Sequence, residues 1–290
     1  MVTSVWRLAI HSVSTFLEDG CLSRGAAIAF YAVTSLGPVM LIIIAVAGLA
    51  YGEDAARGVL VERLSDEMGE STASFVQSAV GSAWRHGTGS IATILGILTL
   101  VLTATGMFSE MQTALNVIFR ITPVPLTMFR LIRDKVISLA LVIGLAAVLV
   151  FSVVIAAGIS ALQEQIDQFL PFASELFRGV DIIVSLALLT GIIAAIYKIL
   201  PECTFPWMDV AVGALVTAVL ITIGRVAISI YIGRSGVASS YGAAGSVMAA
   251  LLWIYYSAQI FLLGAEFTRG YAERHELLKA DRAERTRAEV

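Results

Sequence analysis

Long runs of apolar residues follow one another along the chain, separated by short polar segments. Six runs reach about 20 mostly apolar residues, the length that crosses a lipid bilayer as a helix. The predicted spans are residues 26–51, 90–118, 133–161, 179–200, 209–232 and 243–268. The pattern predicts an all-α polytopic membrane protein built as a bundle of six transmembrane helices.

The segments around these spans have their own patterns. Residues 1–25 lack the short apolar core and cleavage site of a signal peptide, and apolar and polar residues recur there on opposite sides of a helix: Trp6, Ile10, Val13 and Leu17 against Arg7, Ser14 and Glu18. This predicts an N-terminal cytoplasmic amphipathic helix, which either lies in the membrane interface or packs on the end of the bundle.

The remaining flanking segments complete the predicted domain organisation. Residues 52–89 interleave apolar with acidic residues and predict a small helical outer cap, packed on the bundle or serving as a binding element. With this cap, residues 26–271 form the six-helix transmembrane domain. Residues 272–290 are a charged cytoplasmic tail, either helical or disordered.

Composition agrees with a membrane protein and excludes several other classes. The chain of 290 residues is 58% hydrophobic and 14% charged, against about 45–50% and about 25% in soluble domains. A net charge of −3 does not indicate a nucleic-acid-binding protein. Two cysteines and three widely separated histidines predict neither a disulfide framework nor a metal centre. We expect no cofactor, no catalytic residues and no enzymatic activity.

The distribution of basic residues predicts the orientation. Thirteen of the 19 lysines and arginines lie at the two termini and in the loops after the second and fourth spans. Because loops rich in lysine and arginine stay on the cytoplasmic side, both termini are expected to be cytoplasmic. Cys21 and Cys203 then lie on the reducing side of the membrane.

Polar residues inside the first two spans are candidates for a transport pathway, because such residues must face protein or water. In the first span, Tyr31, Ser35 and Pro38 share one helical face, and Pro38 predicts a kink. The second span is the most polar, and Glu110 is the candidate for a buried carboxylate. Its neighbours Ser109, Gln112 and Asn116 widen the polar face beyond what lipid would tolerate.

The fifth and sixth spans carry further candidates. Arg225 lies within the fifth span, where a salt bridge, a bond to helix carbonyls and anion binding are all open. In the sixth span, Tyr255, Gln259 and Glu266 share one face. Gln259 and the tyrosines are expected to contact the second span. Glu266 is expected to be an anchor at the cytoplasmic mouth, paired with Arg269, where its charge is least costly.

Four blocks of the sequence resemble one known family. They are AAIAFYAVTSLGPVMLI at 26–42, GMFSEMQTALNVIF at 106–119, LPECTFPWMDVAVGALVTA at 200–218 and SSYGAAGSVMAALLWIYYSAQIFLLGAEFTR at 239–269. Their order and spacing resemble the YihY/BrkB family of bacterial inner-membrane proteins. The resemblance implies six spans, cytoplasmic termini and the bacterial inner membrane. It implies no defined activity: members have been linked to serum resistance and, in one branch, to lipid export. An older ribonuclease BN label is regarded as a misassignment.

Two function classes follow from these observations. The leading hypothesis is a transporter or exporter of a small solute or lipid-type substrate, moving through a polar cavity between the first, second, fifth and sixth spans. Glu110 would bind a proton and Arg225 would attract an anionic head group. The alternative is a structural or envelope-assembly membrane protein whose polar residues only satisfy one another. Ribonuclease activity is not supported, because no cluster of carboxylates or histidines is predicted. Membrane lipids are the expected partners.

Overall fold

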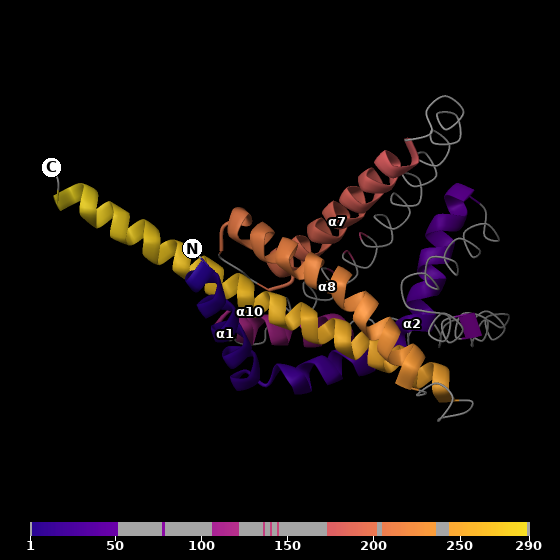
Figure 1. Ribbon diagram of the computed structural model, residues 1–290. Helices are drawn as coiled ribbons and strands as arrows, with labels where there is room; N and C mark the ends of the chain where they lie inside the picture. The colour runs from indigo at the N-terminus through magenta and orange to yellow at the C-terminus, as the bar shows by residue number, and fades with distance from the viewer. Residues whose placement is uncertain are drawn as a thin grey trace.

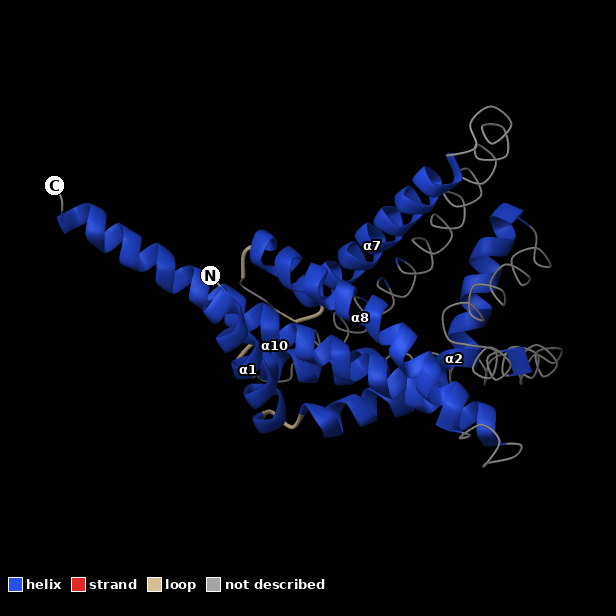
Figure 2. Ribbon diagram, in the orientation of Figure 1, coloured by secondary structure: helices blue, strands red, loops and turns tan. Residues whose placement is uncertain are grey.

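A computed structural model describes residues 2–51, 77–78, 106–121, 136, 140, 144, 173–201, 205–235 and 244–288. Throughout these residues the regular structure is helical (Figure 2). The labelled helices are α1 (Val2–Glu18), α2 (Cys21–Tyr51), α7 (Ala173–Ile199), α8 (Trp207–Ser235) and α10 (Gly245–Ala288). A further helix covers residues 106–118. The predicted all-α class is confirmed.

Among the described residues, three helices are long and apolar enough to cross a membrane. Their apolar segments are Ile182–Ile199 in α7, Trp207–Ile232 in α8 and Gly245–Leu277 in α10, and α2 contains a shorter one, Cys21–Leu36. On α8, the side chains of Ile223, Val226 and Ile230 are exposed. A helix that keeps such side chains on its outside fits a lipid environment, in which an apolar surface carries no penalty.

The other predicted segments are described only in part. The helix at 106–118 is the end of the predicted second span, and of the third only residues 136, 140 and 144 are described, as helix. Apart from residues 77 and 78, which are helical, the predicted outer cap lies outside the described residues.

Helix α10 is the central element of the described bundle. It packs against α8, α2 and α1, and α7 packs against α8 (Figure 1). Beyond α1, α10 continues away from the bundle to Ala288 (Figure 1). The predicted charged tail is therefore helical in its described part. Its alanine, glutamate, leucine and arginine residues favour a helix, and neither glycine nor proline interrupts it up to Ala288.

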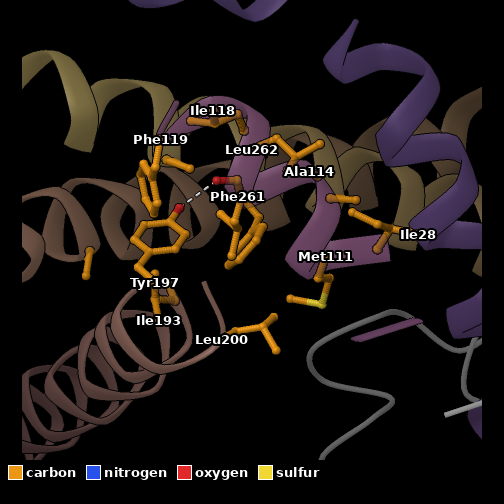
Figure 3. Packing of buried hydrophobic residues seen from close by; sticks show 14 of the residues in the cluster. Ile28, Met111, Ala114, Ile118, Phe119, Ile193, Tyr197, Leu200, Phe261 and Leu262 are labelled. Carbon is orange, nitrogen blue, oxygen red and sulfur yellow. Dashed lines mark hydrogen bonds between the residues drawn. The ribbon is translucent and has the colours of Figure 1, made fainter. Parts of the chain in front are cut away.

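The end of helix 106–118 meets α7 and α10 in an aromatic core around Tyr197 (Figure 3). The Tyr197 hydroxyl donates a hydrogen bond to the Phe261 carbonyl oxygen over 2.5 Å and lies 3.3 Å from Thr217 Oγ1. The ring of Phe119 stands edge-on to that of Tyr197 at 6.1 Å. A buried phenol is stable here because its hydroxyl has a partner.

Helices α8 and α10 approach closely through a reciprocal pair of glycines and threonines. Thr268 packs onto Gly213, and Thr217 packs onto Gly264, so that a Cβ at either glycine would overlap the facing threonine. Each threonine hydroxyl donates to the carbonyl oxygen four residues earlier in its own helix, Gly213 or Gly264. Small residues at a helix crossing are typical of membrane bundles, where close packing replaces the hydrophobic effect between helices.

A turn at Asp19 and Gly20 separates α1 from α2. Gly20 has a φ of 65°, and its carbonyl oxygen accepts from the backbone N–H groups of Ser23 and Arg24 at the start of α2. Glycine adopts this conformation without a steric penalty. The predicted boundary at residue 25 was therefore wrong: α1 ends at Glu18, and residues 21–25 already belong to the helix of the first span.

Candidate functional site

Five charged side chains meet where α10 leaves the bundle. They come from the turn after α1, the end of helix 106–118 and one side of α10, and we call them the charged cluster: Asp19, Arg120, Glu266, Arg269 and Glu273. Glu266 and Arg269 lie one turn apart on α10, so their side chains share a face. The Glu266 side chain is 0% exposed and that of Arg269 is 4% exposed.

Arg269 is the central cation of this cluster. Its Nη2 lies 3.3 Å from Glu266 Oε2, its Nη1 lies 3.7 Å from Asp19 Oδ2, and its Nε lies 3.5 Å from Glu273 Oε1. Nη1 also donates to the Ile118 carbonyl oxygen over 2.9 Å. One guanidinium thus joins α10, the α1–α2 turn and the end of helix 106–118. A lysine, with a single nitrogen, could not make these contacts together.

Arg120 reaches the cluster from the C-terminal end of helix 106–118, where an arginine occupies a position that glycine usually takes. The N–H of Ile121 donates to the Asn116 carbonyl oxygen and that of Arg120 to the Val117 carbonyl oxygen, which is the Schellman arrangement. Arg120 takes the left-handed position of this motif, with a φ of 55°. Glycine usually occupies that position. Here the arginine side chain donates to Asp19 Oδ1 over 2.8 Å.

Two carboxyl groups of the cluster, those of Asp19 and Glu266, are buried beside Arg269. Arg269 lies 3.7 Å from Asp19 Oδ2 and 3.3 Å from Glu266 Oε2, and Thr15 donates to Glu266 Oε2 over 3.0 Å. Asp19 Oδ2 and Glu266 Oε1 are buried and accept no hydrogen bond. Each carboxyl group therefore keeps one acceptor oxygen without a donor, and both groups depend on Arg269 for charge compensation.

Charges of both signs are buried together in the cluster. Asp19, Glu266 and Arg269 are buried, whereas Arg120 and Glu273 are about half exposed. The Arg24 side chain also donates to the Asp19 carbonyl oxygen over 3.2 Å. Buried carboxylates of this kind are costly unless paired. Arg269, which is buried with Asp19 and Glu266, therefore compensates two buried carboxylates at once. Among the described residues, no group of histidine, cysteine and acidic side chains has the arrangement of a metal site.

Glu266 is more deeply buried than its place in the sequence suggested. Its pairing with Arg269 agrees with the structure. The expectation that its charge lies at an open mouth was wrong, because α1 covers this end of α10.

The polar residues of the second span do not form the expected buried face. Phe108, Met111, Leu115 and Ile118 make the buried side of helix 106–118. Glu110, Gln112 and Asn116 are partly exposed and Ser109 is exposed. The prediction that Glu110 is the buried carboxylate was wrong: the helix is rotated so that its apolar stripe packs inward, as an amphipathic helix in a protein core does.

The candidates of the first and sixth spans pack against each other. The Tyr31 ring lies against Gly106, and the buried Ser35 hydroxyl donates to the Ala32 carbonyl oxygen over 3.0 Å. Tyr255 packs beside Ala29 and Ala32 of α2. Tyr31 and Tyr255 thus lie near the described part of the second span, where Met107 joins the same apolar cluster. Tyr256, the other tyrosine of the sixth span, packs against Gly224 of α8.

Gln259 contacts the helix of the first span. Its Nε2 donates to the Leu22 carbonyl oxygen over 3.3 Å, and its side chain fills the space beside Gly25. The expected contact of Gln259 with the second span stays a prediction, because residues 90–105 of that span lie outside the described residues. Gly25 leaves a gap on α2 that the amide enters, a feature that span boundaries do not reveal.

Pro38 and Arg225 lie outside the charged cluster. Helix α2 continues through Pro38, and its ribbon changes direction along its length (Figure 1), as a proline-containing helix is expected to do. Arg225 lies on α8, is partly exposed, and interacts with another group of the protein.

The sequence pattern did not reveal two features of the site. Asp19 and Arg120 are 101 residues apart, so only the fold brings them together. The second feature is a pair between α8 and α10, in which His275 Nδ1 lies 2.7 Å from the buried Asp209 Oδ1. The aspartate–glycine turn after an amphipathic helix was the one available signal, because it marks Asp19 as a residue at a helix junction.

Comparison with known proteins gives the family. A model of the virulence factor BrkB family matches residues 12–289. The chain is 24% identical to a UPF0761 membrane protein of Rhodospirillum centenum over 89% of its length and 56% of that protein. It is 27% identical to one of Alcanivorax borkumensis, over 89% of its length and 58% of that protein. The chain thus spans somewhat more than half the length of these relatives.

No solved structure matches the chain. The family match covers both the apolar helices and all five residues of the charged cluster. The chain belongs to the virulence factor BrkB family of membrane proteins.

Proposed function

We propose that the chain is a transporter or exporter of a small solute or lipid-type substrate in the bacterial inner membrane, and not an enzyme. Both termini are proposed to be cytoplasmic, as the basic residues of the loops suggest. Membrane lipids are its partners in this proposal. The observation that supports it best is the charged cluster buried on α10, because ionisable groups within membrane helices are retained for function by default.

The cluster suits a gate at the cytoplasmic end of a pathway. Arg269 ties α10 to Asp19 in the α1–α2 turn and to the Ile118 carbonyl oxygen. A proton on Glu266 would remove one negative charge facing Arg269 and weaken this tie. The three elements could then separate, and loss of the proton would close them again. Proton coupling, assigned to Glu110 from the sequence, is here assigned to Glu266.

Reconstituted protein tests the proposal. Liposomes containing the purified chain would receive a head-group-labelled fluorescent phospholipid and, separately, an entrapped pH dye. Lipid exposure to dithionite reports lipid movement, and the dye reports proton movement. We expect Glu266→Gln to abolish any pH dependence of transport. The matched control is Glu273→Gln. Glu273 also pairs with Arg269, but the Glu273 side chain is 52% exposed, so this change should leave the pH dependence unchanged.

A structural role is the second candidate, and one observation favours it. Arg269 makes an ion pair or hydrogen bond to each element around it, as a static lock between helices would. Removal of residues 276–290 separates the two candidates. If the truncation causes an envelope defect in cells while the full chain moves neither lipid nor protons in liposomes, the structural role is correct and transport is wrong.

A further inference from the structure

Helix α1 has three faces: one that packs on the bundle, an exposed apolar stripe and an exposed polar stripe. Successive residues of a helix lie about 100° apart, so residues three and four apart share a side. The packing face contains the buried Ser12, Thr15 and Phe16. Leu8 extends this face against Gly270 of α10. The side of α1 that packs on the bundle is therefore partly polar.

The apolar side of α1 points away from the protein. Trp6, Ile10, Val13 and Leu17 are between 49% and 68% exposed. Beside this apolar stripe lies a polar stripe of exposed residues, Arg7, His11, Ser14 and Glu18. Within it, the Ser14 hydroxyl donates to Glu18 Oε1 over 2.9 Å. An apolar and a polar stripe side by side along one helix match the boundary between lipid and water.

The position of α1 agrees with that boundary. Its packing face contacts α10 at Glu266, through Thr15, and at Gly270, through Leu8. These residues flank the predicted end of the last span at residue 268. The exposed apolar surface also continues past the turn onto α2, where Leu22 and Phe30 are exposed at the start of an apolar helix. The apolar stripe of α1 is thus an extension of a lipid-facing surface.

We propose that α1 lies in the membrane interface, with Trp6, Ile10, Val13 and Leu17 in the lipid and its polar stripe in water. Lipid holds one side of the helix, and Thr15 and Asp19 hold the other side on Glu266 and Arg269. The occupant of the apolar face is the bilayer itself. The polar stripe carries one arginine and one glutamate, so the binding is apolar and does not require anionic lipid. This inference does not depend on transport.

Spin labels at single cysteines test the proposal in the full chain. With Cys21 and Cys203 replaced by serine, one cysteine is placed at position 10, 13 or 17, or at the control positions 7, 11 or 14 on the polar stripe. All six side chains are exposed, so the packing face stays intact. The protein is reconstituted in phosphatidylcholine vesicles, with and without phosphatidylglycerol. Power saturation then measures collisions with oxygen, which concentrates in lipid, and with a water-soluble nickel chelate.

The expected result is a clear division between the stripes. The ratio of oxygen to nickel collisions should be several-fold higher at 10, 13 and 17 than at 7, 11 and 14, with and without anionic lipid. Equal nickel access at both sets would overturn the proposal by placing the apolar stripe in water. Labels at 10, 13 and 17 that are immobile and shielded from both reagents would overturn it in favour of a protein partner, such as a second copy.

A second measurement uses the natural tryptophan, in case a label disturbs α1. Vesicles of lipids brominated near the head group should quench the wild-type fluorescence more than that of Trp6→Phe. Equal quenching of the two proteins would contradict the placement of Trp6 in lipid.

Discussion

Replacing Arg269 by methionine should destabilise the bundle strongly. Methionine keeps most of the apolar stem but removes the charge that faces Glu266 at 3.3 Å and Asp19 at 3.7 Å. It also removes the donor to the Ile118 carbonyl oxygen. Because the Arg269 side chain is only 4% exposed, water cannot replace these contacts. Breaking a buried ion pair on one side costs about 3–5 kcal/mol, and we expect a loss in that range.

Arg120→Met is the matched control for this experiment. Arg120 pairs with the same Asp19 and at a shorter distance, 2.8 Å, but its side chain is 53% exposed. Exposed ion pairs contribute about 0–1 kcal/mol. If burial determines how much an ion pair contributes to the free energy of unfolding, the longer contact of Arg269 with Asp19 stabilises the protein more than the shorter contact of Arg120 with Asp19.

The assay is equilibrium unfolding of the purified protein in mild detergent micelles by added dodecyl sulfate, followed by far-ultraviolet circular dichroism. A double variant, Glu266→Gln with Arg269→Met, should lose less stability than the sum of its single variants, since the two charges compensate each other. A loss for Arg269→Met no greater than for Arg120→Met would refute the reasoning and show that water reaches the cluster.

Three further predictions concern the packing around the site. Gly264→Ala should lower stability because the added Cβ overlaps the Cβ, Oγ1 and Cγ2 atoms of Thr217. Thr217→Gly in the same chain removes all three atoms and should recover part of the loss, and failure of the second change to help would argue against the overlap. Tyr197→Phe removes the hydroxyl that donates to the Phe261 carbonyl oxygen and should cost about 1 kcal/mol in the same unfolding assay, whereas an unchanged midpoint would mean that this bond contributes nothing. In a Cys203→Ser chain, the fully buried Cys21 should react with a maleimide only after denaturation, and rapid labelling of the native protein would contradict its burial.

The class of the protein was determined by the sequence. Apolar runs at 179–200, 209–232 and 243–268 are matched by α7, α8 and α10, whose apolar segments are long enough to cross a membrane. Such runs are recognisable because transfer of a residue into lipid depends on that residue and its near neighbours, and hardly on the rest of the fold. The pairing of Glu266 with Arg269 was accessible for the same reason, since one helical turn separates them.

The rotation of each helix was decided by the tertiary structure. The sequence placed Glu110 on a polar stripe, but packing turned the apolar side of that helix inward and left Glu110 partly exposed. In α1, the apolar stripe could be recognised from the sequence, yet its outward direction could not. A periodic pattern defines the faces of a helix. It does not define which face meets protein when lipid also accepts apolar side chains.

The site itself is a product of long-range packing. Thr15 and Glu266 are 251 residues apart, and Asp19 meets Arg120 across 101 residues. No local pattern records such contacts. A buried charge is stable only where the fold delivers an opposite charge or a hydrogen-bond partner. The sequence by itself therefore determined that the chain is a helical membrane protein, and the tertiary structure decided which of its charges are buried together.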